Sequence, residues 1–236
     1  MITLRNISLA YDDRTLIENA SAEFGTGELC ALVGRNGAGK STLLRAIIAA
    51  GQPLAGEVLL DNRPAASLAP EALARIIAFV GTDKIRIANL LCEDVVAIGR
   101  APYTNWIGRM QSLDRDIVAQ SLHAVGMESF AKRTIDTLSD GECQRIMIAR
   151  ALAQQTPNII LDEPTAFLDI PNRFDICRLL SKLAHNDGKC ILFSTHDMDA
   201  ALPVCDSFAV IDGGTLHKYS TAELRDRKII ERIFTR

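Results

Sequence analysis

Residues 34–42, GRNGAGKST, constrain the fold of this chain more than any other stretch. An apolar run at 29–33 precedes them and is typical of a buried strand, and residues 43–48 suit the start of a helix. Glycines let backbone N–H groups turn inward, and a helix N-terminus adds partial positive charge. This order predicts a phosphate-binding loop in which Lys40 reaches the β- and γ-phosphates and Ser41 binds Mg²⁺. The alternative is a flexible glycine-rich turn beside a solvated lysine.

Composition narrows the class of protein. The 236 residues are enough for one sizeable core, and 48% of them are hydrophobic, which is normal for a globular chain. No apolar run approaches the ~20 residues that span a bilayer, and no secretory leader opens the sequence, so we expect a cytoplasmic protein. The net charge of −3 does not suggest a nucleic-acid partner. Six scattered cysteines without a CxxC pair are typical of buried, reduced thiols.

The order of apolar and polar stretches predicts an α/β fold. Residues 1–24 alternate as in a small antiparallel sheet, and the later apolar runs, separated by helices, predict a mostly parallel, doubly wound sheet. We expect strands at 57–61, 76–80, 158–161, 190–193 and 208–211, helices at 70–75, 89–99, 113–126, 138–155, 173–186 and 221–234, and a loop at 99–106. The expected units of a single domain, 1–236, are a nucleotide-binding core with its antiparallel β subdomain (1–82 and 156–220), an inserted α-helical subdomain (83–155) and a C-terminal helix (221–236).

Two carboxylates follow the apolar run at 158–161. Asp162 and Glu163 stand at the C-terminal end of a buried strand, which is where ligands bind in open α/β sheets. There Asp162 can hold Mg²⁺ beside Ser41, and Glu163 can orient and deprotonate a water that attacks a γ-phosphate. The alternative is a solvated pair of acids at a strand end.

Three further sites are ambiguous on their residues alone. Ser139 and Glu142 fit a capping box at a helix start, which is a sufficient structural role. His196 follows the strand at 190–193 and is either structural or a donor to a γ-phosphate oxygen. Tyr11 lies at a polar turn, where it either stacks on a purine or is an ordinary turn residue.

Together these stretches resemble the ATP-binding cassette (ABC) ATPases over nearly the whole chain. Residues 34–42 are similar to the Walker A loop of that family, 159–163 to its Walker B and 138–142 to its LSGGQ signature. The resemblance implies a P-loop NTPase core that uses ATP and Mg²⁺. It implies these site residues: catalytic Glu163, His196 and Lys40; nucleotide-binding Tyr11, Gly34, Arg35, Asn36, Gly37, Ala38, Gly39, Lys40, Ser41 and Thr42; a signature of Ser139, Gly141 and Glu142 that caps the partner's ATP; Asp169 of the D-loop; and metal-binding Ser41, Asp162 and Thr82.

Two departures from the family pattern affect the site. The signature has Asp140 and Glu142 where the commonest form has Gly and Gln, and an extra acid near a triphosphate weakens its binding. Thr82 stands where the family has its Q-loop glutamine, and its shorter hydroxyl reaches Mg²⁺ only through water. We therefore expect different coupling between the ATP site and a transport domain.

The resemblance also implies partners. ABC ATPases work as head-to-tail homodimers, and a transport role here requires separate integral membrane permease subunits and, indirectly, a substrate-binding protein. Residues 95–103 are similar to the ATPases that serve iron-siderophore, haem and cobalamin uptake, so we expect such an importer on the cytoplasmic side of a bacterial inner membrane. The alternatives are a non-hydrolysing regulatory cassette, a soluble ABC ATPase that acts on ribosomes or DNA, and a P-loop kinase of small molecules.

Overall fold

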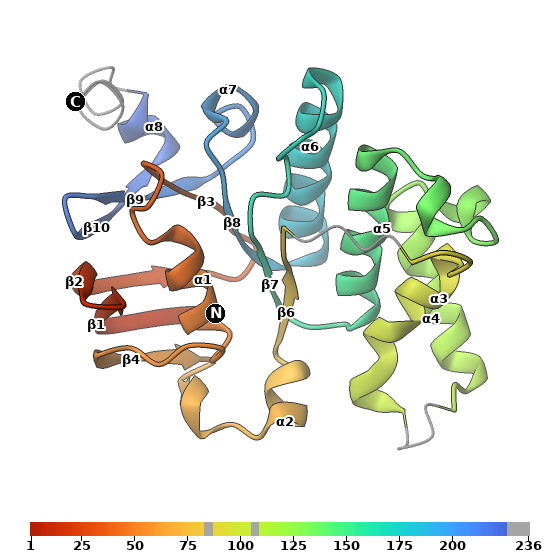
Figure 1. The fold of residues 1–236 in the computed structure, drawn as a ribbon, viewed down its shortest axis with the longest axis horizontal. Coiled ribbons are helices and arrows are strands. Elements are labelled where there is room, and N and C mark those ends of the chain that lie inside the picture. The colour runs from red at the N-terminus through yellow and green to blue at the C-terminus, as the bar shows by residue number, and fades with distance from the viewer. Residues whose placement is uncertain (83–86, 105–108, 226–236) are drawn as a thin grey trace.

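The computed structural model describes residues 1–82, 87–104 and 109–225, which form two β-sheets with helices around them (Figure 1). The first sheet is antiparallel and has the strand order β2-β1-β4-β5. Its strands are β1 (Ile2–Tyr11), β2 (Arg14–Phe24), β4 (Ala55–Leu60) and β5 (Arg63–Pro64). The small antiparallel sheet predicted at the N-terminus is confirmed.

The second sheet has the order β10-β9-β3-β8-β7-β6. It is parallel from β9 to β6, and β10 is its antiparallel edge. Its strands are β3 (Leu29–Gly34), β6 (Ile77–Val80), β7 (Asn158–Leu161), β8 (Cys190–Ser194), β9 (Ser207–Asp212) and β10 (Thr215–Ser220). Apolar runs form these central strands because helices or the other sheet cover both of their faces.

Two hydrophobic clusters lie on the two sides of the parallel sheet. Alternate residues of β3 divide between them: Ala31 and Val33 join one cluster, and Cys30 and Leu32 join the other. The second cluster also contains the inward side chains of β1 and the apolar face of α1 (Lys40–Ile47), so α1 packs between the two sheets. Because alternate side chains of β3 are buried on both faces of the sheet, this strand is held firmly in place. The phosphate-binding loop begins at its end.

Helices cover the other side of the sheet and one end of the molecule. In Figure 1, α3, α4 and α5 lie together at the end away from the antiparallel sheet, and α6 lies against the parallel sheet. The helices after α1 are α2 (Pro70–Ala74), α3 (Cys92–Ala97), α4 (Ser112–Ala124), α5 (Asp140–Ala153), α6 (Ile170–Asp187), α7 (Met198–Ala201) and α8 (Thr221–Leu224), with 3-10 turns at Ala65–Ser67, Ile98–Tyr103, Glu128–Phe130 and Ile135–Thr137. The predicted fold class is confirmed.

Three expected elements differ from the structure. The helix expected at 89–99 begins only at Cys92, because Leu91 pairs with Thr134 in an isolated β-bridge. The expected loop at 99–106 starts as a 3-10 turn, and its residues 105–108 lie outside the described part of the chain. Of the C-terminal helix expected at 221–234, Thr221–Leu224 is helical and residues 226–236 lie outside the described part. The proposed subdomain bounds stay a prediction.

Candidate nucleotide-binding site

The loop between β3 and α1 has the backbone shape that its glycines permit. Gly37 and Gly39 have φ of +76° and +104°, in the left-handed region where a side chain is strained. At the start of the loop, a Cβ on Gly34 would lie 2.8 Å from the backbone oxygen of Ile211, so β3 and β9 approach here as only glycine allows. The sequence G-x-x-G-x-G therefore serves two purposes, a close strand contact and a tight turn.

Lys40 occupies the centre of this loop. It is the first residue of α1, its exposed fraction is 7%, and its Nζ donates a hydrogen bond to the backbone oxygen of Gly34 at 3.0 Å. The alternative of a solvated lysine beside a flexible turn is therefore wrong. The loop holds a fixed positive charge next to the first N–H groups of α1, and that arrangement attracts phosphate.

An open pocket of about 850 Å³ lies over this loop. Its lining comes from the β1–β2 turn, the loop, the start of α1 and the end of β7: Tyr11, Asp12, Asp13, Arg14, Leu16, Asn36, Gly37, Gly39, Lys40, Ser41, Thr42 and Glu163. Tyr11 is 63% exposed, so its ring is available to a ligand in the pocket. The structure thus joins the predicted aromatic residue, the predicted loop and one of the two predicted carboxylates in a single pocket.

The two carboxylates after β7 have different surroundings. Asp162 is buried, and its Oδ1 accepts a hydrogen bond of 2.6 Å from the hydroxyl of Ser194. The same hydroxyl accepts a hydrogen bond of 2.8 Å from the backbone N–H of Glu163. Ser194 ends β8, the strand between β3 and β7, and so fixes both acids against the strand next to the loop. They are not a solvated pair at a strand end.

Glu163 has a strained backbone and an accessible carboxylate. Its φ is +46°, which a non-glycine residue adopts only at a cost of about 1 kcal/mol or more. Its side chain is 27% exposed, and its Oε2 lies 3.5 Å from Nδ1 of His196. The strained backbone directs this carboxylate into the pocket, while the preceding Asp162 stays against Ser194. His196 and Glu163, predicted from separate stretches, therefore meet.

Thr82 follows β6 and does not line the pocket that contains Ser41. It lines a small cavity of about 20 Å³ together with Glu163, the first turns of α5, and residues 166–168. Gln144 of α5 also lines this cavity, and its Nε2 is buried without a hydrogen-bond partner among the described residues. The three residues predicted for the metal do not share a pocket: Ser41 lines the pocket over the loop, Thr82 lines the small cavity, and Asp162 is in neither lining.

The signature stretch forms the N-terminus of α5. The Ser139 hydroxyl accepts a hydrogen bond from the backbone N–H of Glu142, and the Glu142 carboxylate accepts hydrogen bonds of 2.8 Å from the N–H and the hydroxyl of Ser139. These hydrogen bonds hold the pKa of the Glu142 carboxyl below its usual range. The capping box is therefore present. Ser139, Gly141 and Glu142 do not line the pocket over the loop of their own chain.

Residues 166–169 connect β7 to α6. Asp169 caps α6, and its carboxylate accepts a hydrogen bond of 3.1 Å from the backbone N–H of Asn172. Phe167 is 75% exposed, with φ of +64°. Arg173 of α6 donates to the backbone oxygen of Leu168 at 2.7 Å and to Asp197 at 3.2 Å, and so ties this connection to the segment that follows His196.

Two residues of the site, Ser194 and Arg14, were not predicted from the sequence. Ser194 holds both Asp162 and Glu163, and Arg14 lines the pocket beside Tyr11. Ser194 belongs to the stretch Ser-Thr-His-Asp, so a signal was present: a hydroxyl at the end of a central strand. Its role depends on the strand order, which places β8 beside β7 and which the sequence does not show.

The fold and the pocket define a class of protein first. A parallel sheet, a glycine-rich loop from its strand into a helix, a lysine inside that loop and two acids on a nearby strand end define a P-loop nucleotide-binding protein. Comparison of this chain with known proteins identifies its family. The ABC transporter family model matches residues 17–166. The chain therefore belongs to the ABC transporter family, and it is an ABC ATPase that binds ATP.

Relatives cover nearly the whole chain. It is 33% identical to the achromobactin transport ATP-binding protein CbrD of Dickeya dadantii, over 99% of this chain and 87% of that protein. It is 31% identical to the iron(3+)-hydroxamate import ATP-binding protein FhuC of Bacillus subtilis, over 99% of this chain and 87% of that protein. A dimeric ATP-binding cassette with bound ADP and Pi superposes with a TM-score of 0.78 at 28% identity, over 94% of this chain and 99% of that one. Within the described residues, the helices are too short or too polar to cross a membrane.

Proposed function

We propose that this chain hydrolyses ATP to power an importer, as a peripheral subunit on the cytoplasmic side of a bacterial inner membrane. The transport itself would take place in separate permease subunits, which receive cargo from a substrate-binding protein. The relatives named for achromobactin and iron(3+)-hydroxamate transport support this role. Residues 95–103 resemble siderophore-type ATPases, in agreement with this role. The proposed cargo class is an iron-siderophore, haem or cobalamin.

In the proposed complex, ATP lies in the pocket over the phosphate-binding loop. The adenine ring stacks on Tyr11, and the phosphates lie among the N–H groups of residues 34–42 and the ammonium group of Lys40. Ser41 and Asp162 offer hard oxygen ligands, which Mg²⁺ prefers, and Mg²⁺ takes only one or two protein oxygens when phosphates supply the rest. Bound Mg²⁺ would neutralise charge on the β- and γ-phosphates.

The contact between Glu163 and His196 carries the proposal of hydrolysis. A carboxylate at the mouth of the phosphate pocket can accept a proton from the attacking water, and an imidazole 3.5 Å away can donate to a γ-phosphate oxygen. Ser194 keeps the neighbouring Asp162 out of this role, because its hydroxyl occupies one oxygen of that carboxylate. The two acids thereby have separate tasks, metal binding and proton transfer.

The site in one chain is incomplete, so we propose a head-to-tail homodimer. The N-terminus of α5 carries the partial positive charge of a helix start, which favours phosphate, and it does not line the pocket of its own chain. In the proposed dimer, Ser139, Gly141 and Glu142 of one copy close the pocket of the other, and Asp169 contributes to the same interface. The exposed Phe167 beside Asp169 is suited to burial there.

A weakly hydrolysing regulatory cassette is the second candidate. Thr82 favours it, because the family pattern has a longer glutamine at this position, which lines the cavity with Glu163. The extra acid Asp140 in the signature favours it as well. Intact Glu163 and His196 argue for hydrolysis. The ATPase rate of the purified chain decides between the two functions.

The substitution Glu163→Gln tests the proposed function. The amide keeps the size of the side chain and removes the proton acceptor, so we expect unchanged ATP affinity and a steady-state ATPase rate lowered by at least about a hundredfold. Fluorescence titration with a labelled nucleotide and phosphate release measure the two quantities. Near-normal hydrolysis by Glu163→Gln removes this residue from the proposed mechanism.

Lys40→Ala is the matched test of the pocket itself. Removal of the buried ammonium group leaves the loop without its central charge, so ATP affinity or ATP hydrolysis should fall while the fold persists. Circular dichroism checks the fold. Unchanged affinity and rate in Lys40→Ala would contradict the proposed position of the phosphates.

A further inference from the structure

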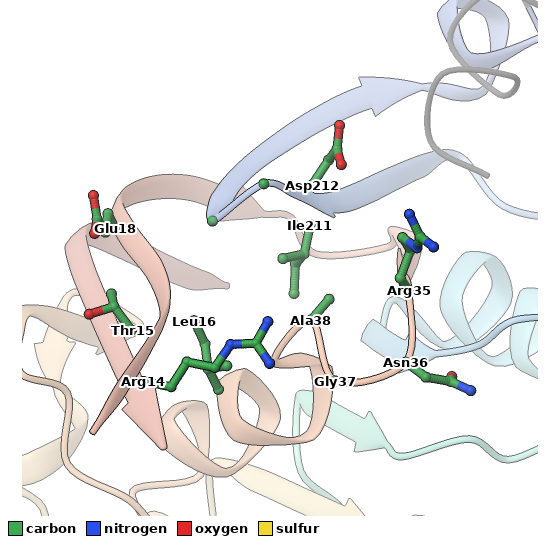
Figure 2. A pocket seen from close by; sticks show the side chains of 12 residues that line it. Arg14, Thr15, Leu16, Glu18, Arg35, Asn36, Gly37, Ala38, Ile211 and Asp212 are labelled. Carbon is green, nitrogen blue, oxygen red and sulfur yellow. The ribbon is translucent and has the colours of Figure 1, made fainter. Parts of the chain in front are cut away.

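Arg14 lies at the start of β2, across a two-residue turn from Tyr11. The two residues are partners in the antiparallel register of β1 and β2. Arg14 lines the pocket over the phosphate-binding loop, and it also lines a second pocket of about 510 Å³ to which Ala38 and Asp212 contribute. Figure 2 shows its side chain extending from β2 toward the loop at Ala38. The residue is therefore placed between the proposed adenine position and the loop.

The guanidinium group of Arg14 is available to bind a phosphate. Among the described residues that line the pocket over the loop, the cations are Arg14 and Lys40, and Lys40 already donates to the oxygen of Gly34. The Arg14 side chain is exposed, and within the described part of the chain its guanidinium group makes neither a hydrogen bond nor an ion pair, although Asp12 and Asp13 precede it in sequence. A guanidinium group offers a planar fork of donors that matches phosphate oxygens.

From this geometry we propose that Arg14 is a second cationic ligand of the nucleotide phosphates and raises the affinity of this site for ATP and ADP over uncharged nucleosides. The proposal rests on the ATP position proposed above. Lys40 holds the phosphates from inside the loop, and Arg14 approaches them from β2, on the side of Tyr11. The ring of Tyr11 then stacks on the base, and Lys40 and Arg14 bind the phosphate chain from two sides.

A structural role for Arg14 is the competing explanation. An arginine stem also covers apolar surface, here beside Leu16, and its loss can loosen the β1–β2 turn. That role predicts a lower melting temperature and equal losses for every ligand that touches the turn. A phosphate contact predicts losses that depend on whether the ligand carries phosphate. The ligand series below separates these roles.

The experiment uses three variants of the full chain: Arg14→Gln, Arg14→Lys and Arg63→Gln. Arg63 is an exposed arginine of β5 in the same antiparallel sheet, and it lines none of the pockets described above, so it is the matched control. Competition against a fluorescent nucleotide measures the affinities for ATP, ADP and adenosine. We expect Arg14→Gln to bind ATP and ADP about tenfold more weakly, a change of about 1.4 kcal/mol that is close to the lower end for a hydrogen bond to a charged group, and to bind adenosine as before.

The conservative variant and the control sharpen the result. Arg14→Lys keeps the charge and loses the planar fork, so we expect a loss of about threefold. Arg63→Gln should match the unsubstituted chain for all three ligands. Unchanged ATP affinity in Arg14→Gln overturns the proposal, and so does an equal loss for adenosine. If Lys40→Ala weakens ATP binding while Arg14→Gln does not, only the role of Arg14 fails. If Lys40→Ala also binds ATP normally, the proposed ATP position fails.

Discussion

The side chain of Gln144 has a buried amide nitrogen that no hydrogen bond within the described residues compensates. Its Nε2 is buried and lacks a hydrogen-bond partner among the described residues, and a buried unpaired donor costs about 1–3 kcal/mol. The side chain lines the cavity that also holds Thr82 and Glu163. A polar group is therefore kept, at a cost in stability, next to the proposed catalytic carboxylate.

The substitution Gln144→Leu tests that cost. Leucine has a similar volume and no unpaired donor, so we expect the free energy of unfolding to rise by roughly 1 kcal/mol. Urea denaturation measures this change, with exposed Gln120→Leu of α4 as the control, for which we expect less than about 0.5 kcal/mol in either direction. A clear loss of stability in Gln144→Leu would mean that the amide has a partner, such as a bound water.

At the scale of elements, the capping box of α5 adds a pH-dependent stability. The pKa of the Glu142 carboxyl is lowered because Ser139 donates to it from its backbone N–H and its hydroxyl. A carboxyl whose folded-state pKa is lowered stabilises the fold fully above its unfolded pKa of about 4.3, and this contribution is lost as the pH falls through the lower, folded pKa.

Glu142→Ala and Glu142→Gln separate the charge from the cap. We expect Glu142→Ala to lower the free energy of unfolding by about 1 kcal/mol at pH 7, and this difference from the unsubstituted chain should shrink below about pH 4. Glutamine keeps an acceptor for Ser139 without a titrating group, so Glu142→Gln should retain most of the stability and lose this pH dependence. Urea denaturation from pH 3 to pH 7 measures both. A difference for Glu142→Ala that is constant over this range would contradict the argument.

The elements also show how far the sequence could predict the fold. The central strands were predictable because continuous apolar runs suit a sheet that is covered on both faces. The edge strand β10 was missed because, of its six residues, only Leu216 is buried, so its sequence lacks an apolar run. The start of α3 was misplaced because Leu90 and Leu91 fit a helical face, yet Leu91 bridges to Thr134, a contact 43 positions away that no local pattern encodes.

In the candidate site, too, local sequence patterns were predictable and contacts between distant residues were not. The loop at 34–42 and the pair after β7 were predictable, because each consists of neighbours in sequence. The contact of His196 with Glu163 and the hydrogen bonds of Ser194 depend on β8 lying between β3 and β7. Strand order is a property of the whole sheet, so these contacts emerged only from the structure.

At the scale of the whole molecule, the position of α5 determines what one chain can do. Its N-terminus belongs to the group of helices that lies away from the antiparallel sheet (Figure 1), whereas the phosphate pocket is lined by the β1–β2 turn, the loop after β3, the start of α1 and Glu163. The exposed Ser139 at that N-terminus is absent from the pocket lining. In a head-to-tail pair, each of the two sites would combine Lys40 of one copy with Ser139 of the other.

Mixing two inactive variants tests this arrangement. Lys40→Ala and Ser139→Arg each damage both sites of a homodimer, so each alone should be nearly inactive. A mixed dimer has one site with both substitutions and one with neither, because the intact Lys40 of one chain faces the intact Ser139 of the other. With random pairing, half of the dimers are mixed and half of their sites are intact, so we expect phosphate release at about a quarter of the unsubstituted rate. If Ser139 served its own chain, every site in the mixture would carry one substitution, and the mixture would stay as inactive as its components.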